Sequence, residues 1–351
     1  MRILVTGGAG FVGANLALAL ASEGQEVISL DNLHRRGSEL NLPRLRDAGV
    51  AFVRGDVRSP ADLAAVGHVD ALVECSAEPS ALAGVDGSTE YVLQTNLVGA
   101  INCLDAARAC DAFVVFLSTS RVYPVAALDQ VAYEETETRY EIAAAQELPG
   151  VSPAGIAESF PLEGARTLYG TSKLCAELLI AEYAESFGVR AVVDRCGVIA
   201  GPWQMGKVDQ GVFTHWVLSH VIGRELTYIG YGGSGKQVRD LLHVDDLVDL
   251  VSLQLADPGT WAGVTANVGG GREISLSLRE TTALCQELTG REVPLLDSAA
   301  ARPGDVRIYL SDCERLFGLT DWRPRRGARQ VLEDIHRWIV DNEESVRAAL
   351  S

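Results

Sequence analysis

A tyrosine and a lysine four residues apart are the most reactive pair of side chains that the sequence suggests. Tyr169 and Lys173 stand in the segment Tyr169-Gly170-Thr171-Ser172-Lys173, which opens a stretch with helical character, and residues i and i+4 lie on one face of a helix. A phenol has a pKa of about 10, and a neighbouring ammonium lowers that pKa because it favours the phenolate. The pair is therefore a candidate general base, although the same spacing also occurs on ordinary helix surfaces.

Three hydroxyl side chains, Ser118, Thr119 and Ser120, follow the apolar run 112–117. This run is predicted to be a buried strand, and open α/β sheets bind ligands at the carboxyl ends of their strands. Thr119 can hydrogen-bond a substrate hydroxyl there and share its proton with Tyr169. The alternative is a hydroxyl cluster that only caps the end of the strand.

A glycine-rich turn follows the first apolar run, residues 2–6. Gly7, Gly10 and Gly13 have the spacing G-x-x-G-x-x-G and open a predicted helix over 11–22. Glycines let the backbone approach a pyrophosphate, and a helix N-terminus favours negative charge. Asp31, at the end of the second predicted strand, can bind a ribose diol and would repel a 2′-phosphate. The sequence thus predicts a dinucleotide site that prefers NAD, although glycine-rich turns also serve packing alone.

Two neighbouring segments leave alternatives open. Arg35 and Arg36 follow Asp31 closely and can either serve the 2′-phosphate of NADP or lie in a solvated loop. Gly55-Asp56-Val57 follows the third predicted strand and would place a carboxylate near an adenine, or form an ordinary turn.

Composition and charge exclude several classes of protein. The chain has 30 basic and 47 acidic residues, for a formal net charge of −17, which opposes a nucleic-acid-binding surface. Its apolar runs are shorter than the roughly 20 residues that cross a membrane, and its start does not resemble a signal peptide. The seven cysteines include no C-x-x-C pair, so we expect reduced thiols, no metal site and a cytoplasmic protein.

Short apolar runs alternate with helical stretches in the first half of the chain. The runs cover residues 2–6, 26–30, 51–53, 71–75 and 112–117, and the clearest helical stretches cover 11–22 and 87–108. This alternation predicts an α/β fold with a doubly wound parallel sheet covered on both faces. Residues 124–168 break the pattern and are expected to form a long functional loop. Further elements are expected as helices over 169–187, 211–222, 244–255 and from 328, and as a strand over 190–195.

Taken together, these residues resemble the extended short-chain dehydrogenases/reductases, which are NAD-dependent epimerases and dehydratases of sugar nucleotides. The resemblance spans nearly the whole chain and includes Arg239–Asp246, Asn267–Gly270, Arg302–Asp305 and Trp322–Pro324. A closer resemblance, to the CDP-tyvelose (CDP-paratose) 2-epimerases, is carried by Asp31–Gly37, Glu135–Tyr140, Asp209–Gly211 and Gly235–Asp240. It implies a NAD-binding Rossmann domain over 1–200 with 236–262, and a smaller nucleotide-sugar-binding domain over 201–235 with 263–351.

The resemblance also implies roles for individual residues. Tyr169, Lys173 and Thr119 would be catalytic. The NAD site would comprise Gly7, Gly10, Phe11, Val12, Gly13, Asp31, Asn32, Arg36, Asp56, Val57, Ala77, Asn96, Ser118, Tyr169, Lys173 and Cys196. The nucleotide-diphosphate sugar would contact Glu78, Thr119, Arg121, Gln204, Gln210, Arg239 and Arg302, with Arg239 and Arg302 on the diphosphate.

The chain departs from the family after the fourth predicted strand. The family often has His-x-Ala-Ala/Gly-Gln there, whereas this chain has Glu74-Cys75-Ser76-Ala77-Glu78. Glu78 can place a carboxylate beside the sugar. Cys196 can in principle act as a second acid or base, but most free cysteines are buried structural thiols.

The reaction implied by the resemblance inverts C2 of a nucleotide-activated hexose. Tyr169 would remove the proton of the C2 hydroxyl with help from Thr119, and the hydride would leave C2 and return on the other face. Thr119 is followed by Ser120-Arg121 instead of the acids of a 4,6-dehydratase or a decarboxylase, which disfavours both. A 4-epimerase needs the same three residues and is the first alternative, and a non-catalytic NAD-binding sensor is the second.

Members of this family usually form homodimers or larger homo-oligomers through helices that correspond to 87–108 and 169–187. Leu174, Leu178 and Leu179 suit such an interface, although a role in the core fits them equally well.

Overall fold

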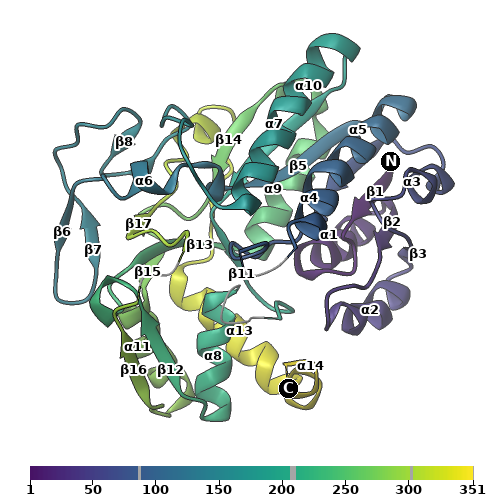
Figure 1. Cartoon of the computed structure of the whole chain (residues 1–351). Helices are drawn as coiled ribbons and strands as arrows, with labels where there is room; N and C mark the ends of the chain where they lie inside the picture. The colour runs from purple at the N-terminus through teal and green to yellow at the C-terminus, as the bar shows by residue number, and fades with distance from the viewer. Residues whose placement is uncertain (86–87, 206–210, 301–302, 351) are drawn as a thin grey trace. The chain divides into compact units, whose positions relative to one another are not determined.

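The computed structural model describes residues 1–85, 88–205, 211–300 and 303–350 (Figure 1). Two compact units contain the chain. The first consists of Met1–Thr119, Leu168–Arg195 and Leu247–Thr265, and the second of Ser120–Thr167, Cys196–Asp246 and Ala266–Ser351. These bounds differ from the expected domains in that residues 120–167, 196–200 and 236–246 group with the second unit and residues 263–265 with the first.

A seven-stranded sheet forms the core of the first unit, in the order β14-β10-β5-β4-β1-β2-β3. The strands that pair from β3 to β5 run parallel, and the order reverses between β1 and β4, as in a doubly wound Rossmann sheet. The prediction of this fold is therefore confirmed. The strands are β1 (Arg2–Thr6), β2 (Glu26–Asp31), β3 (Ala51–Arg54), β4 (Ala71–Glu74), β5 (Phe113–Thr119), β10 (Ala191–Cys196) and β14 (Thr265–Val268).

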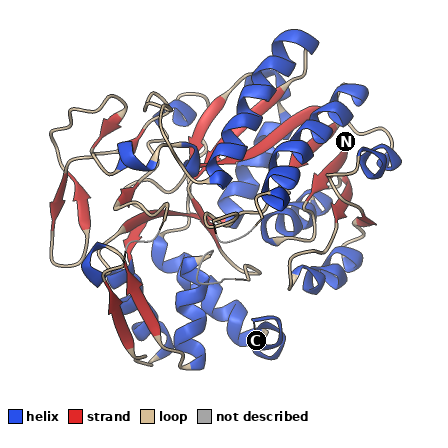
Figure 2. Ribbon diagram, in the orientation of Figure 1, coloured by secondary structure: helices blue, strands red, loops and turns tan. Residues whose placement is uncertain are grey.

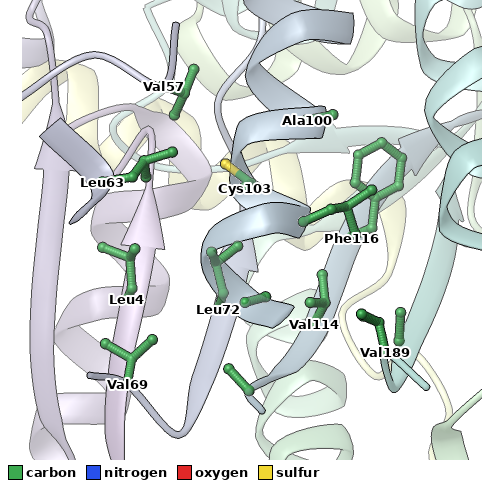
Figure 3. Close-up of a cluster of buried hydrophobic side chains, with 14 of the residues drawn as sticks. Leu4, Val57, Leu63, Val69, Leu72, Ala100, Cys103, Val114, Phe116 and Val189 are labelled. Atoms are coloured by element: carbon green, nitrogen blue, oxygen red, sulfur yellow. The ribbon is translucent and has the colours of Figure 1, made fainter. Parts of the chain in front are cut away.

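Helices enclose this sheet because its strands are apolar on both faces. Every residue of β5 is buried, as a strand covered on both sides requires. On one face, side chains of α3, α5 and α7 share a cluster with Leu4, Leu72, Val114 and Phe116 (Figure 3). The helices of this unit are α1 (Phe11–Ser22), α2 (Leu42–Asp47), α3 (Pro60–Val66), α4 (Glu90–Leu93), α5 (Gly99–Cys110), α7 (Leu168–Phe187), most of α9 (Val244–Ala256) and α10 (Pro258–Trp261).

The stretch 87–108, expected to be one helix, is divided in the structure. α4 continues into a π-helical turn over Gln94–Val98 before α5 begins at Gly99. A Cβ on Gly99 would lie 2.7 Å from Cγ2 of Val57, so the helix passes this strand connection closely because residue 99 has no side chain. π-helical turns inside α-helices are frequent at functional sites.

The second unit mixes short strands and helices (Figure 2). Residues 124–168, expected to be a loop, contain helix α6 (Val125–Leu128) and two antiparallel hairpins, β6 (Tyr133–Glu135) with β7 (Tyr140–Ile142), and β8 (Val151–Ser152) with β9 (Gly155–Ile156). The other strands are β11 (Val198–Ala200), β12 (Leu226–Ile229), β13 (Val238–His243), β15 (Ser275–Ser277), β16 (Leu295–Ser298) and β17 (Ile308–Tyr309). The other helices are α8 (Val212–Ile222), α11 (Leu278–Thr289), α12 (Glu314–Phe317), α13 (Ala328–Asp341) and α14 (Glu343–Leu350).

Among the described helices, none combines the length and the apolar character that a membrane crossing requires.

The turn between β1 and α1 depends on glycine. Gly7 has φ +63°, a value that favours glycine, and a Cβ there would lie 2.9 Å from the backbone carbonyl of Cys75. A Cβ on Gly13 would lie 2.2 Å from the carbonyl oxygen of Gly7. The first turn of α1 therefore packs directly against the backbone that precedes it.

We expect Gly13→Ala to lower the melting temperature by several degrees and to abolish NAD binding, because the methyl group would push apart backbone atoms that cannot move independently. Gly259→Ala is the matched control, since a Cβ there meets only Asp257 Oδ1, at 3.4 Å. Thermal unfolding monitored by circular dichroism measures both variants. Equal melting temperatures for Gly13→Ala and the wild type would contradict the account of the turn.

Candidate functional site

The candidate site of the first unit lies where the strand order reverses. Thr6, the last residue of β1, pairs with Glu74, the last residue of β4, and Glu74 pairs in turn with Phe116 of β5. Ligands of doubly wound sheets bind outside the carboxyl ends of the strands at this reversal. The glycine turn after β1 and Thr119 at the end of β5 belong to the same edge of the sheet.

Helix α7 brings the Tyr-Lys pair to this edge. It begins at Leu168, so Tyr169 and Lys173 occupy its first two turns, as the spacing predicts. Tyr169 is half-buried, whereas the side chain of Lys173 is only 2% exposed. Lys173 Nζ lies 3.1 Å from Glu74 Oε2 and 4.0 Å from the centre of the Phe116 ring. The ammonium is therefore enclosed by protein groups that favour its positive charge.

Asn96 joins the loop after β4 to the start of α7. Its side chain lies in the π-helical turn and is fully buried. The backbone N–H of Glu78 donates to Asn96 Oδ1 at 2.7 Å, and Asn96 Nδ2 donates to the carbonyl of Glu78 at 3.1 Å and to Ser172 Oγ at 3.2 Å. Asn96 thereby fixes the loop that contains Ala77. The carboxylate of Glu78 accepts from the backbone N–H of Ser80 at 3.2 Å.

Asp31 lies at the end of β2, where the sequence predicts a ribose ligand. Its carboxylate accepts from the backbone N–H of Ala9 at 3.1 Å and of Leu33 at 2.7 Å. Burial raises the pKa of Asp31 above its ordinary value, and the two N–H donors oppose that rise. Each carboxylate oxygen has a second lone pair for a hydroxyl of a bound ribose.

The N-terminus of α1 fits a pyrophosphate. Gly10 caps the helix without a side-chain hydrogen bond, and the first turn of α1 contains no acidic residue. The N–H groups of Phe11, Val12 and Gly13 thus keep the positive end of the helix dipole available to an anion. With Asp31, these residues are the candidate ligands for the phosphate and ribose groups of NAD.

Asp56 has a structural partner that the sequence did not reveal. Its carboxylate binds Arg58 at 2.6 Å and accepts from Asn32 Nδ2 at 2.9 Å, and the Arg58 guanidinium holds the pKa of Asp56 well below its usual range. Arg58 also lies 5.1 Å from the centre of the Tyr91 ring. Of the remaining predicted NAD ligands here, Val57 is a core residue and Arg36 is exposed.

Ser118 takes part in a buried network that the sequence reasoning missed. Its hydroxyl donates to Glu177 of α7, and Glu177 forms an ion pair with Arg195 of β10 at 2.7 Å. All three side chains are buried. The network fixes the middle of α7 to the sheet. Glu177 lies four residues after Lys173, on the same helix face, and this spacing was the signal in the sequence that could have pointed to the network. Cys196, next to Arg195, is buried.

The predicted substrate residues of the second unit fall into three groups. Arg121 and Arg239 line the same small pocket, where Arg121 donates to the carbonyl of Gly304 at 2.6 Å and Arg239 binds Asp305 at 2.5 Å. Gln204 is buried. Its Oε1 accepts from Thr214 Oγ1 at 2.6 Å, and its Nε2 donates to the carbonyl of Ile199 at 3.0 Å. Gln210 and Arg302 lie outside the described residues.

The raised pKa of Asp31 predicts a pH dependence of NAD affinity. Only the ionised carboxylate can accept from both ribose hydroxyls, so the Kd for NAD should rise by about tenfold for each pH unit below the pKa of Asp31. Asp31→Asn should bind NAD more weakly and without this dependence, while Asp47→Asn, at an exposed carboxylate, should keep it. Fluorescence titrations from neutral to acidic pH measure the Kd, and a flat wild-type profile would contradict the assignment.

Comparison with known proteins places the chain in a family. The sequence model of the NAD dependent epimerase/dehydratase family matches residues 3–269. A CDP-paratose 2-epimerase from Salmonella typhi is 31% identical over 350 residues, which cover 96% of this chain and 99% of that protein. A dTDP-glucose 4,6-dehydratase from Mycolicibacterium smegmatis is 31% identical over 359 residues, or 98% and 94% of the two chains.

A solved structure agrees with this placement. The UDP-glucose 4-epimerase of Thermus thermophilus, crystallised with NAD, has a TM-score of 0.77 and 25% identity, and the match covers 97% of this chain and 99% of that one. The resemblance seen in the sequence is therefore confirmed, and so is the expectation of NAD as cofactor. The chain is a member of the NAD-dependent epimerase/dehydratase family.

Proposed function

We propose that the protein is a nucleotide-sugar epimerase that inverts C2 of an NDP-hexose, as the name of its Salmonella typhi relative describes for CDP-paratose. The observation that carries this proposal is the 31% identity to that relative over 96% of this chain. The set Thr119, Tyr169 and Lys173 lies in one unit, with Lys173 buried beside the end of the sheet, and supplies the groups for the chemistry. Ser120 and Arg121 follow Thr119, where a 4,6-dehydratase of this family would have an acid pair. The reaction therefore consists of an oxidation followed by a reduction, with no elimination step.

Each residue of the set has a distinct role. The Tyr169 phenolate accepts the proton of the C2 hydroxyl while the C2 hydride leaves, which yields a 2-keto sugar. Thr119 hydrogen-bonds the same oxygen, and the Lys173 ammonium favours the phenolate. NAD supplies the hydride acceptor and returns the hydride. The hydride returns to the other face of C2, and Tyr169 gives the proton back to the oxygen. The sugar is then inverted at C2, and Tyr169 and the cofactor are back in their starting states.

The second unit supplies the groups for the nucleotide diphosphate in this proposal. Arg121 and Arg239 place two guanidinium groups in one pocket, and each can bind two oxygens of a phosphate. Arg302 and Gln210 are assigned to the same ligand from the resemblance alone. Gln204 is a further candidate, and in the structure its amide is bonded to Thr214 and Ile199.

Inversion at C4 is the alternative. The 4-epimerase from Thermus thermophilus shares the fold over almost the full chain, and a UDP-glucose 4-epimerase from Corynebacterium glutamicum is 28% identical over 346 residues. The same three residues serve either carbon, because the orientation of the sugar decides which hydroxyl meets Tyr169. A non-catalytic NAD sensor is disfavoured because such proteins typically lose the Tyr or the Lys.

We also propose a homo-oligomer formed through α5 and α7. Leu178 on α7 is 65% exposed and Phe187 is 47% exposed, whereas Leu179 packs partly against the core. Burial of Leu178 between two copies would remove apolar surface from water.

Tyr169→Phe should reduce turnover of the nucleotide sugar by at least about a thousandfold while NAD stays bound, because the variant lacks only the group that accepts the proton. Chromatography of cofactor released by heat quantifies NAD, and a coupled epimerisation assay quantifies turnover. The control is Tyr183→Phe, which changes a half-buried tyrosine on the same helix as Tyr169 and removes a hydroxyl that donates to Asp105 of α5; it should keep wild-type turnover. Full activity of Tyr169→Phe would rule out the proposed base.

Substrates deuterated at C2 or at C4 distinguish the two epimerases. With a panel of CDP-, GDP- and UDP-sugars, we expect inversion and a kinetic isotope effect at C2, with the deuterium retained because the hydride does not exchange with water. Mass spectrometry and NMR of the products report the position. Inversion at C4 alone would replace the 2-epimerase by the 4-epimerase and leave the roles of Tyr169 and Lys173 unchanged.

A further inference from the structure

The partner of Lys173 is a buried carboxylate. Glu74 ends β4 with its side chain only 1% exposed, and its Oε2 lies 3.1 Å from Lys173 Nζ. The two residues are 99 positions apart in the chain. Glu74 stands at the reversal of the strand order, between Thr6 and Phe116 in the sheet register.

A second hydrogen bond fixes the orientation of this carboxylate. Ser76 Oγ donates to Glu74 Oε1 at 2.9 Å and lies 3.2 Å from Thr6 Oγ1. Both oxygens of Glu74 are therefore occupied, one by a hydroxyl and one by the ammonium. Glu74 and Ser76 are both departures from the family's usual pattern after this strand, and the structure shows that these two departures contact each other.

The ion pair has two opposite effects on the chemistry of the site. A buried ammonium without a countercharge is costly, so Glu74 stabilises Lys173 and holds it in place. The same carboxylate offsets the positive field that Lys173 exerts on its helix neighbour Tyr169. The Lys173 ammonium has three N–H donors, and the bond to Glu74 leaves the others for a ligand.

We propose that Glu74 is a positioning residue for proton transfer, which holds the Lys173 ammonium at the strand reversal and sets the pH range in which Tyr169 acts as the base. This inference rests on the proposed function only in taking Tyr169 as the base.

The other titratable groups around Lys173 do not replace Glu74. Cys75 after β4 is half-buried and Cys103 of α5 is buried. Desolvation of the two thiols, with the charge of Glu74 as a smaller cause, raises the pKa of both, so both stay neutral. Glu177, one turn further along α7, is neutralised by Arg195 of β10. Glu74 therefore supplies the countercharge that changes the field at Tyr169.

The first test is the pH profile of turnover for Glu74→Gln, measured on the NAD-loaded protein. Loss of the carboxylate strengthens the field of Lys173 at Tyr169, so the acidic limb of kcat/KM should move to lower pH by about one unit, or about tenfold in rate at a fixed acidic pH. Glu74→Asp keeps the charge and should keep the limb near its wild-type position. Asp105→Asn, which removes a carboxylate from the surface of α5 in the same unit, is the charge control and should leave the limb unmoved.

The second test needs no turnover. Glu74→Gln and Lys173→Met should each lower the melting temperature by several degrees, because each leaves one buried charge unpaired. The double variant has no unpaired charge, so its melting temperature should fall by less than the sum of the two single decreases. Thermal unfolding without substrate measures this coupling. Additive losses would show that the two side chains do not interact and would overturn the proposal.

The outcomes separate this inference from the proposed function. Full turnover by Tyr169→Phe would refute Tyr169 as the base, while the unfolding cycle would still report on the ion pair. Suppose that Tyr169→Phe is inactive and that Glu74→Gln is folded. An acidic limb of Glu74→Gln that stays in place or moves to higher pH would then overturn the role of Glu74 alone. A loss of stability without a shift of the limb would likewise reduce Glu74 to a structural residue.

Discussion

The charge on Lys173 is the constraint that the first unit must satisfy. An ammonium that is 2% exposed needs a countercharge, and the neighbouring end of the parallel sheet provides one. β4 contributes Glu74, and β5 contributes the Phe116 ring directly beside it in register. The cation thus has an ion pair and an aromatic face at a single position, at the edge where ligands of such sheets bind.

The remaining parts of the site follow from holding α7 against that edge. Asn96 bonds the loop after β4 to Ser172, and the network of Ser118, Glu177 and Arg195 fixes the helix one turn later. Tyr169 then lies half-buried in the first turn of a helix that is held at Ser172, Lys173 and Glu177. Anchoring of this kind limits the movement of a base relative to its substrate, which matters because small displacements cost large factors in rate.

Much of this could be predicted from the sequence, because the signals are local. Apolar runs of strand length predicted β1 to β5, and the spacings of Gly7, Gly10 and Gly13 and of Tyr169 and Lys173 predicted the two functional segments. The partner of Lys173 could not be predicted in this way. Glu74 is 99 residues from Lys173, and only the packing of α7 against the sheet brings them together. The hairpins within 133–156 were missed because strands of two or three residues carry no periodicity.

The central claim, an ionisable phenol beside a charged lysine, can be measured directly. Phenolate absorbance is titrated with pH for the wild type and for Tyr169→Phe. The difference between the two titrations isolates Tyr169 from the other tyrosines. The account predicts a difference signal that develops well below pH ~10, the ordinary value for tyrosine, and that disappears when Lys173 is replaced by Met. A difference signal at the ordinary value, or one that is indifferent to Lys173, would contradict it.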